Sequence, residues 1–160
     1  MGSGAVTVMG GVPTDTLAAD ADPSDLGELG HEYYYNGSFF KLVKNADGSA
    51  LTAFRIVEWS DPAIGTASVT GTTTAGTGTT VYTAGVVQAA LAASGGIGFV
   101  CSGGLTEGVF GGTTAAGDAL YCDDTDGKFA KATVGTHHIL GHSVDAGADG
   151  TASTVYLNRL

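Results

Sequence analysis

The stretch FFKLVKNADG, residues 39–48, carries the clearest indication of fold class in this chain. Its aromatic and branched apolar residues favour a β-strand, and the Asp-Gly pair near its end suits the tight turn of a β-hairpin. A second stretch, AFRIVEW at residues 53–59, has the same character and ends at Ser60-Asp61-Pro62. Its apolar residues fall on both faces of an extended strand, so one face is expected to border a partner. Together the two stretches predict paired strands joined by a hairpin.

Short β-prone runs separated by turn residues continue from there to the end of the sequence. Their spacing of about ten residues is typical of antiparallel sandwiches and barrels. Glycine accounts for 27 of the 160 residues, and glycine suits turns better than helix interiors. We therefore predict an all-β domain over residues 31–160, a small antiparallel β-barrel or sandwich with at most one short helix. The expected later strands are residues 97–101, 106–110, 119–122, 128–132, 138–144 and 154–157.

Two segments are harder to assign. GVVQAALAA, residues 85–93, fits a short helix ended by the following Ser-Gly-Gly, but its paired valines fit a buried strand equally well. Residues 65–83 are dominated by Thr and Gly, which predicts a long hairpin or surface loop. The glycines there are not followed by Gly-Lys-Ser/Thr, so the segment does not match a phosphate-binding loop.

Residues 1–30 contain two of the three prolines and five acidic residues, with no Lys or Arg. This composition predicts an extended N-terminal arm that buries little surface by itself. Such an arm either has no role or reaches a neighbouring subunit in an assembly. The first residues lack a basic and apolar signal peptide, and no apolar run is long enough for a membrane helix, so we expect no membrane association.

Charge and cysteine content restrict the functional classes. The formal net charge is −10, which repels phosphate backbones and argues against nucleic-acid binding. The acidity serves either solubility or docking onto a surface with basic patches. Cys101 and Cys122 form no CxxC pair, so we expect buried thiols of a protein made in a cytosol, with a disulfide as the alternative if their strands are neighbours.

His138 and His142 are the first candidate metal ligands. On one extended strand they would project from the same face with Leu140 between them, and two imidazoles make half of a zinc shell. No spaced motif supplies the other ligands. Partly exposed strand histidines are therefore the favoured interpretation.

The acidic run CDDTDG, residues 122–127, is the second candidate metal site, through Asp124 and Asp126. An EF-hand loop requires oxygen ligands where this chain has Cys122 and Thr133, so that motif fails. A hairpin turn at Asp126-Gly127 is the favoured interpretation, and a calcium-binding loop of another kind is the alternative. We predict no metal and no cofactor.

Catalytic arrangements are not recognisable in the sequence. The serines lack a Gly-x-Ser-x-Gly context and neither cysteine has a nucleophile's surroundings, so no catalytic residue is assigned and the chain is not expected to be an enzyme.

Aromatic residues offer the best candidates for a binding surface. Alternation along an extended strand would place Tyr33 and Tyr35 on one side and Tyr34 on the other. Tyrosine suits interfaces because its ring buries area while its hydroxyl remains hydrogen-bonded. Core packing and a subunit contact are evenly balanced as interpretations. The candidate interface residues are Tyr33, Tyr34, Tyr35, Phe39 and Trp59.

The C-terminal half resembles the phage capsid decoration proteins, also called structural cement or head decoration proteins. The resemblance lies in a Gly-Asp turn into a strand, a short Gly-Lys hairpin, a Leu-Gly-x-Ser pattern and a closing hydrophobic strand. The segments that carry it are TAAGDAL (114–120), GKFAKA (127–132), ILGHSV (139–144) and TVYL (154–157). Residues 40–45 and 51–53 also resemble segments of tailed-phage head proteins.

The resemblance implies a small β-barrel that binds the outer surface of a phage capsid. It further implies a homotrimer that bridges major capsid proteins and stabilises the head mechanically, with no cofactor or catalytic residue. Such a protein is located in the virion, on the capsid surface, after synthesis in the host cytoplasm. The alternative, from a different class, is a phage fibre, tail or surface module that binds glycans through Tyr33, Tyr34, Tyr35 and Trp59.

Overall fold

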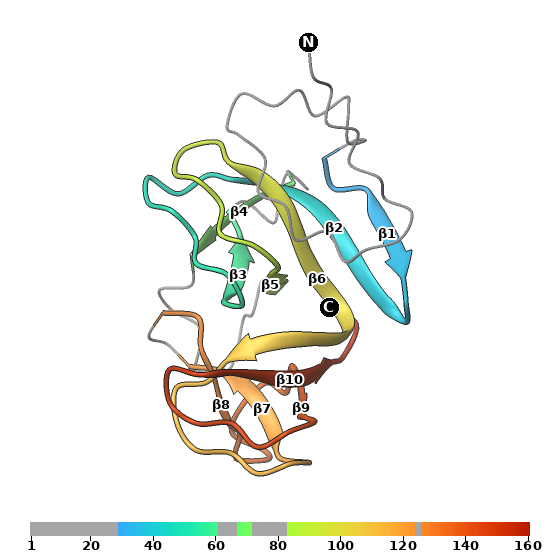
Figure 1. Cartoon of the computed structure of the whole chain (residues 1–160), viewed down its shortest axis with the longest axis vertical. Coiled ribbons are helices and arrows are strands. Elements are labelled where there is room, and N and C mark those ends of the chain that lie inside the picture. Colours follow the sequence, from blue (N-terminus) through green and yellow to red (C-terminus); the bar gives the residue numbers. More distant parts are fainter. Residues whose placement is uncertain (1–28, 61–66, 72–82, 124–125) are drawn as a thin grey trace.

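The computed structural model describes residues 29–60, 67–71, 83–123 and 126–160. Within these residues the regular structure consists of ten strands, with no helix and hence none long enough to cross a membrane (Figure 1). The predicted all-β fold class is confirmed. The strands are β1 (Glu32–Tyr35), β2 (Ser38–Asn45), β3 (Ile56–Trp59), β4 (Ser68–Gly71), β5 (Thr83–Val87), β6 (Ile97–Val109), β7 (Ala119–Cys122), β8 (Phe129–Lys131), β9 (Gly141–Ser143) and β10 (Ala152–Leu157).

Five strands close into a ring. The strand β2 pairs with β4 in parallel, and the antiparallel pairs β4–β3, β3–β5, β5–β6 and β6–β2 complete the circuit. Each of these strands therefore has hydrogen-bonded neighbours on both sides, so the ring leaves no free strand edge. We call β2, β3, β4, β5 and β6 the ring.

The hairpin predicted between residues 39–44 and 53–59 is wrong, because β2 and β3 lie on either side of β4 and do not pair with each other. The Asp47-Gly48 segment instead forms a loop stabilised by side-chain contacts. The Asp47 N–H donates to Asn45 Oδ1 at 2.8 Å, and the Ser49 N–H donates to Asp47 Oδ1 at 3.1 Å. Short polar side chains of this kind stabilise tight loops without a strand partner.

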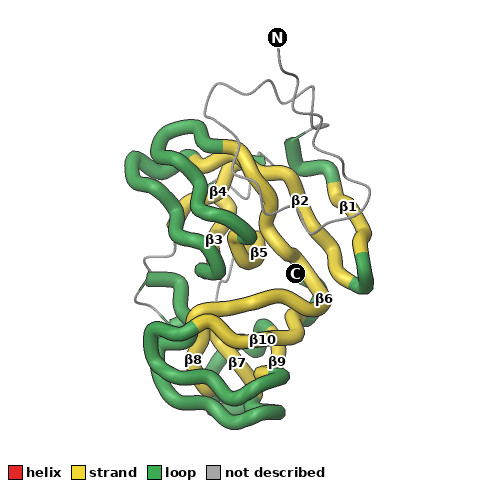
Figure 2. The backbone as a smooth tube through the Cα atoms, in the orientation of Figure 1, coloured by secondary structure: helices red, strands yellow, loops and turns green. Residues whose placement is uncertain are grey.

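Beyond the ring, the second half of β6 begins a C-terminal sheet in which neighbouring strands are antiparallel. The order of pairing is β6–β10–β9–β7–β8 (Figure 2). The predicted β7–β8 hairpin is confirmed, and Asp126 and Gly127 in its turn both have left-handed φ angles of 67° and 63°. Expected strands 138–144 and 128–132 shorten to β9 and β8.

The strand β6 joins the two regions. Two separate strands were expected at 97–101 and 106–110, whereas the structure has one strand of 13 residues that bends midway (Figure 1). The bend falls at Gly103-Gly104, where pairing passes from β2 to β10. Gly104 has a φ of 91°, and a Cβ there would lie 2.5 Å from the Gly37 carbonyl oxygen. Glycine is therefore required at this close approach of two backbones.

Two hydrophobic clusters lie on opposite faces of the ring strands. Leu42 and Val43, adjacent on β2, belong to different clusters, as alternation requires. The inner cluster receives a residue from every ring strand and therefore fills the interior. The outer cluster joins the outward face of the ring to the C-terminal sheet. It contains Phe40, Leu42, Ile56, Val86, Ile97, Phe99, Cys101, Phe110, Leu120, Cys122, Phe129, Leu140, Val155 and Leu157. The inner cluster contains Val43, Leu51, Val57, Val69, Ala84, Val87, Leu91 and Val100.

The ambiguous segments are now assigned. The segment 85–93 begins within β5 and continues as irregular structure with an isolated bridge from Leu91 to Leu51, so its helical interpretation is wrong. The strand β4 lies inside the Thr/Gly-rich stretch, of which residues 65–66 and 72–82 are outside the described residues. Most of the proposed arm, residues 1–28, is outside them too, so the arm and its boundary at residue 30 remain predictions. Leu29 packs against the outer cluster, and the Gly30 N–H donates to the Leu42 carbonyl at 2.7 Å.

Candidate functional site

The strand β1 divides the three consecutive tyrosines between two faces. Tyr33 and Tyr35 turn towards the outer cluster, where the ring of Tyr33 meets that of Phe99 edge to face at 5.7 Å between centroids. Tyr34 points the other way and is 68% exposed. The predicted alternation is thus confirmed, and it assigns Tyr33 and Tyr35 to packing within the subunit.

A two-residue turn sets which side chains accompany Tyr34. Asn36 and Gly37 both have positive φ angles, 47° and 84°, as a tight hairpin between β1 and β2 requires. The resulting register places Tyr34 opposite Phe39 and Glu32 opposite Lys41 on one face. The rings of Tyr34 and Phe39 lie 5.0 Å apart between centroids.

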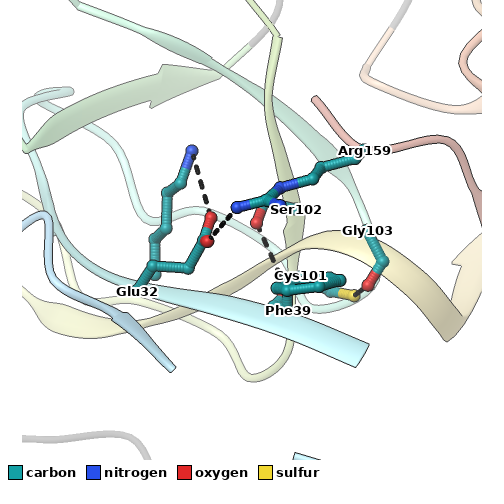
Figure 3. Close-up of polar contacts among 7 residues, drawn as sticks. Glu32, Phe39, Cys101, Ser102, Gly103 and Arg159 are labelled. Atoms are coloured by element: carbon teal, nitrogen blue, oxygen red, sulfur yellow. Dashed lines mark hydrogen bonds and ion pairs between the residues drawn. The ribbon is translucent and has the colours of Figure 1, made fainter. Parts of the chain in front are cut away.

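Arg159, near the C-terminus, reaches the same face from a distant part of the sequence. Its guanidinium lies 4.4 Å from the centroid of the Phe39 ring, and its Nη2 lies 2.5 Å from Glu32 Oε1 (Figure 3). Backbone contacts position it, because the Leu160 N–H donates to the Ser102 carbonyl at 2.8 Å. A Cβ on Gly103 would lie 3.2 Å from Arg159 Cα, so the small residue at the bend also makes room for the C-terminal segment.

Lys41 extends this group of contacts to Trp59, the last residue of the ring strand β3. Its Nζ lies 3.9 Å from Glu32 Oε2 and 5.5 Å from the centroid of the Trp59 ring. Trp59 is half-buried at the end of β3 and packs against the inner cluster. The contacts therefore connect one continuous surface, which we call the β1–β2 surface: Glu32, Tyr34, Phe39, Lys41, Trp59 and Arg159.

The chemistry of the β1–β2 surface suits recognition of another protein. Trp, Tyr and Arg are the residue types that most often dominate binding energy at protein interfaces. Both cations contact aromatic rings, which lowers the cost of covering them. The single carboxylate of Glu32 holds both cations in place. The surface thus presents ordered aromatic and charged groups on a rigid sheet.

Sequence reasoning identified Tyr34, Phe39 and Trp59 in this surface and missed Glu32, Lys41 and Arg159. The Asn-Gly pair at 36–37 is a strong hairpin signal, and it would have aligned Glu32 with Lys41. No local signal connects Arg159 to β1, because the C-terminal segment reaches it through tertiary packing.

The candidate zinc ligands are not arranged as predicted. His142 lies on β9, whereas His138 precedes that strand, so the expectation that both project from one strand is wrong. Leu140 between them is buried, while both histidines are exposed. Within the described ranges, no three His, Cys, Asp or Glu side chains gather in a group able to hold a metal ion.

The candidate calcium loop is described only in part. Asp124 lies outside the described residues, so this alternative stays a prediction. Asp126 occupies the left-handed turn of the β7–β8 hairpin, and its backbone carbonyl accepts a hydrogen bond from Arg55 Nη1 at 3.2 Å.

The two cysteines are buried and are not joined by a disulfide. Burial raises the pKa of the Cys101 thiol to about 11, and hydrogen bonds to Gly103 and Thr106 offset this only in part. A thiol with this pKa is almost entirely protonated at neutral pH, which makes it a poor nucleophile.

Comparison with known proteins gives a relationship at the level of fold. No family model matches the sequence, and no curated protein matches it either. Among solved structures, the fold is similar to that of the head fiber gp8.5 N base of bacteriophage phi29, with a TM-score of 0.53. The alignment covers 75% of this chain and 95% of the other, at 17% sequence identity. At this sequence identity the similarity shows a shared fold alone.

Proposed function

We propose that this chain is a structural protein of a phage head that docks on the outer surface of the capsid. The observation that carries the proposal is the fold similarity to the base of a phage head fiber, which extends over 95% of that chain. The turn-and-strand motifs at residues 114–157 independently resemble capsid decoration proteins. Both similarities support a protein of a phage head, one through the fold and the other through sequence motifs.

The β1–β2 surface is the proposed contact with the major capsid protein. It collects two of the six Lys and Arg residues of an acidic chain, together with its single Trp. Because Glu32 already pairs with both cations, little side-chain entropy is lost when a partner covers them. Exposed Tyr34 is the side chain most available for insertion into a partner's pocket.

In this proposal the chain stabilises the head mechanically. Each copy bridges major capsid proteins and adds interface area that resists internal pressure, and three copies associate as a homotrimer. Within the described strands, β1 pairs only with β2, so its other edge is available to a neighbouring chain. Buried cysteines without a disulfide are consistent with synthesis in a reducing host cytoplasm before incorporation into the virion.

The glycan-binding alternative on the same aromatic residues has less support. It requires Tyr33, Tyr34, Tyr35 and Trp59 to be exposed for stacking on sugars. Tyr33, Tyr35 and Trp59 are half-buried against the clusters of their own subunit, which leaves Tyr34 exposed.

The test is binding to expanded heads of the phage that carries this gene, prepared without the protein. Wild-type protein should bind stoichiometrically and sediment with the heads. Tyr34→Ser should weaken binding at least about tenfold, as expected for a central aromatic contact. Tyr156→Ser is the matched control, because Tyr156 is also an exposed strand tyrosine, 50% exposed, but lies on β10 in the C-terminal sheet.

Two outcomes would contradict the proposal. Heads that never retain the wild-type protein would remove the capsid role. Equal loss of binding in the two tyrosine variants would remove the β1–β2 surface as the contact. Sedimentation equilibrium of the free protein and electron microscopy of decorated heads test the homotrimer separately.

A further inference from the structure

A cavity of about 300 Å³ lies between the β1–β2 hairpin, the residues preceding β3 and the second half of β6. Tyr35, Phe54 and Leu105 contribute apolar walls, while Asn36, Gln88 and Thr106 contribute neutral polar groups. It is separate from the β1–β2 surface, because Tyr35 and Tyr34 project from opposite faces of β1. Its volume is at the lower end of small-molecule sites, which suits a ligand of one ring.

One wall of the cavity is held in a strained conformation. Phe54 has a φ of 61°, in the left-handed region that bulky side chains rarely adopt. Two backbone hydrogen bonds maintain it: the Phe54 N–H donates to the Val87 carbonyl at 2.7 Å, and the Val109 N–H donates to the Phe54 carbonyl at 2.9 Å. Strain of this kind persists where the surroundings enforce it, and it concentrates at functional sites.

Two polar residues of the cavity, Gln88 and Thr106, are buried and retain hydrogen-bonding capacity. Gln88 is 5% exposed, and its Nε2 donates to the Val86 carbonyl at 2.8 Å and to Thr106 Oγ1 at 3.0 Å. The Thr106 hydroxyl has several acceptors within reach, among them Gln88 Oε1 and the Glu107 carbonyl, each at 3.3 Å. A hydroxyl donates one proton at a time, and an amide oxygen has two lone pairs. Gln88 Oε1 can therefore accept a further hydrogen bond from a ligand.

We propose that this cavity binds a neutral saccharide unit. A sugar ring has apolar C–H faces and hydroxyl groups around its edge, so it needs apolar walls together with neutral donors and acceptors. Of the described residues that line the cavity, only Glu107 is charged, and its carboxylate accepts hydrogen bonds from hydroxyls. That negative charge, in a chain of net charge −10, disfavours an anionic ligand.

The test uses the full chain in two arms. Saturation-transfer NMR with glucose, galactose, mannose, rhamnose and N-acetylglucosamine examines free monosaccharides, and an array of immobilised neutral oligosaccharides examines terminal units of polymers. A ligand of about a dozen heavy atoms in an open cavity is expected to bind with a Kd of roughly 1 mM. At least one sugar should give saturation transfer.

Three variants locate the site. Leu105→Trp, at a side chain 52% exposed on the rim, should fill the cavity and weaken binding at least about tenfold. Asn36→Gly should weaken it several-fold while keeping the turn, because glycine tolerates the positive φ of this position. Tyr34→Ser should leave sugar binding unchanged although it weakens attachment to heads, so the two proposals fail independently. Circular dichroism melts establish that each variant is folded.

The proposal is overturned if no sugar in either arm binds the wild-type protein. It is also overturned if Leu105→Trp and Asn36→Gly bind as the wild type does. Loss of sugar binding in Tyr34→Ser with retention in Leu105→Trp would assign the sugar to the exposed aromatic surface instead.

Discussion

The interior of the ring and the layer between the ring and the C-terminal sheet are built from different side chains. The ring interior is filled by Val, Leu and Ala, whereas the outer cluster contains Phe40, Phe99, Phe110 and Phe129. A closed ring of few strands leaves little interior space, so it accepts small and branched residues. The C-terminal sheet is open, and large aromatic side chains fill the space between this sheet and the five-stranded ring. Strand pairing around a closed circuit organises the ring, and hydrophobic packing attaches the C-terminal sheet to it.

The outer cluster couples the unfolding of the ring to that of the C-terminal sheet, because it contains side chains from both. The outer cluster takes Leu42 and Ile56 from ring strands and Leu120 and Leu140 from the C-terminal region. Removing the C-terminal sheet would therefore expose the outward face of the ring. We expect the two regions to unfold together, although each has its own pattern of strand pairing.

The largest expected effect is that of Phe129→Ala, which attacks the packing between the regions. Phe129 is fully buried beside Phe110, with ring centroids 6.1 Å apart. Truncation leaves a cavity and should lower the free energy of unfolding by about 3–5 kcal/mol. Urea unfolding followed by Trp59 fluorescence, which reports the ring, and by far-UV circular dichroism should show both transitions moving to lower urea together.

The control for that experiment is Val134→Ala, at a side chain that is 82% exposed. Its effect should stay within about 0.5 kcal/mol. If Phe129→Ala moves the circular dichroism transition and leaves the Trp59 transition in place, the regions are independent units.

The second effect is that of Gly104→Ala at the bend in β6. An added Cβ would lie 2.5 Å from the Gly37 carbonyl oxygen, at a φ of 91° that disfavours any side chain. The expected loss is about 2–3 kcal/mol, measured by the same urea titration. Gly112→Ala is the matched control, because a Cβ there meets nothing within 4 Å. Equal stability of the two variants would show that the bend does not depend on glycine.

The third effect is an alkaline loss of stability through Cys101, which lies on the ring half of β6. Burial raises the pKa of this thiol from 9.0 to about 11, so the folded state favours the neutral form. The stability that comes from keeping this thiol neutral is fully present below about pH 9, where the thiol of the unfolded chain is also protonated. It is lost as the pH rises towards 11. Between pH 8 and pH 11 the wild type should lose about 2 kcal/mol more than Cys101→Ala, in which other titrating groups are unchanged. Identical losses in the two proteins would contradict the prediction.

Strand pairing was predicted better from the sequence in the C-terminal sheet than in the ring. In the C-terminal sheet, Asp126-Gly127 and the strands around it follow local turn chemistry, so β7 and β8 were located correctly. In the ring, β2 and β4 are parallel and β2 and β3 are separated by β4. Non-local pairing of this kind leaves no pattern in the intervening residues, so the Asp47-Gly48 turn suggested a hairpin that does not form.

The candidate site was predictable to the extent that strand alternation decides it. Alternation gave the opposite orientations of Tyr34 and its two neighbours, but not which face belongs to the core. The positions of Lys41 over Trp59 and of Arg159 over Phe39 depend on tertiary packing. The bend at Gly103-Gly104 was missed because two separate strands, 97–101 and 106–110, were expected where the structure has one bent strand.

The smallest expected effect concerns the charges on the surfaces of the two regions. Glu32 pairs with both Lys41 and Arg159 on the ring side, whereas Lys128 and Asp149 form a single pair at 3.7 Å beside the C-terminal sheet. Partly exposed ion pairs each contribute about 0.2–1 kcal/mol. Glu32→Gln should therefore lower the free energy of unfolding by about 0.5–1 kcal/mol at low salt.

Asp149→Asn is the matched control, because its side chain is 72% exposed and it has one cationic partner. Salt screens exposed charges, so the difference between the two variants should shrink in about 1 M NaCl. A difference that persists at high salt would mean that Glu32 acts through its hydrogen bond with Arg159 rather than through long-range charge. In that case the carboxylate is a structural link between the C-terminal segment and β1, and Arg159→Met, which keeps the contact with Phe39 but removes the donor to Glu32, should lose about as much stability at high salt as Glu32→Gln does.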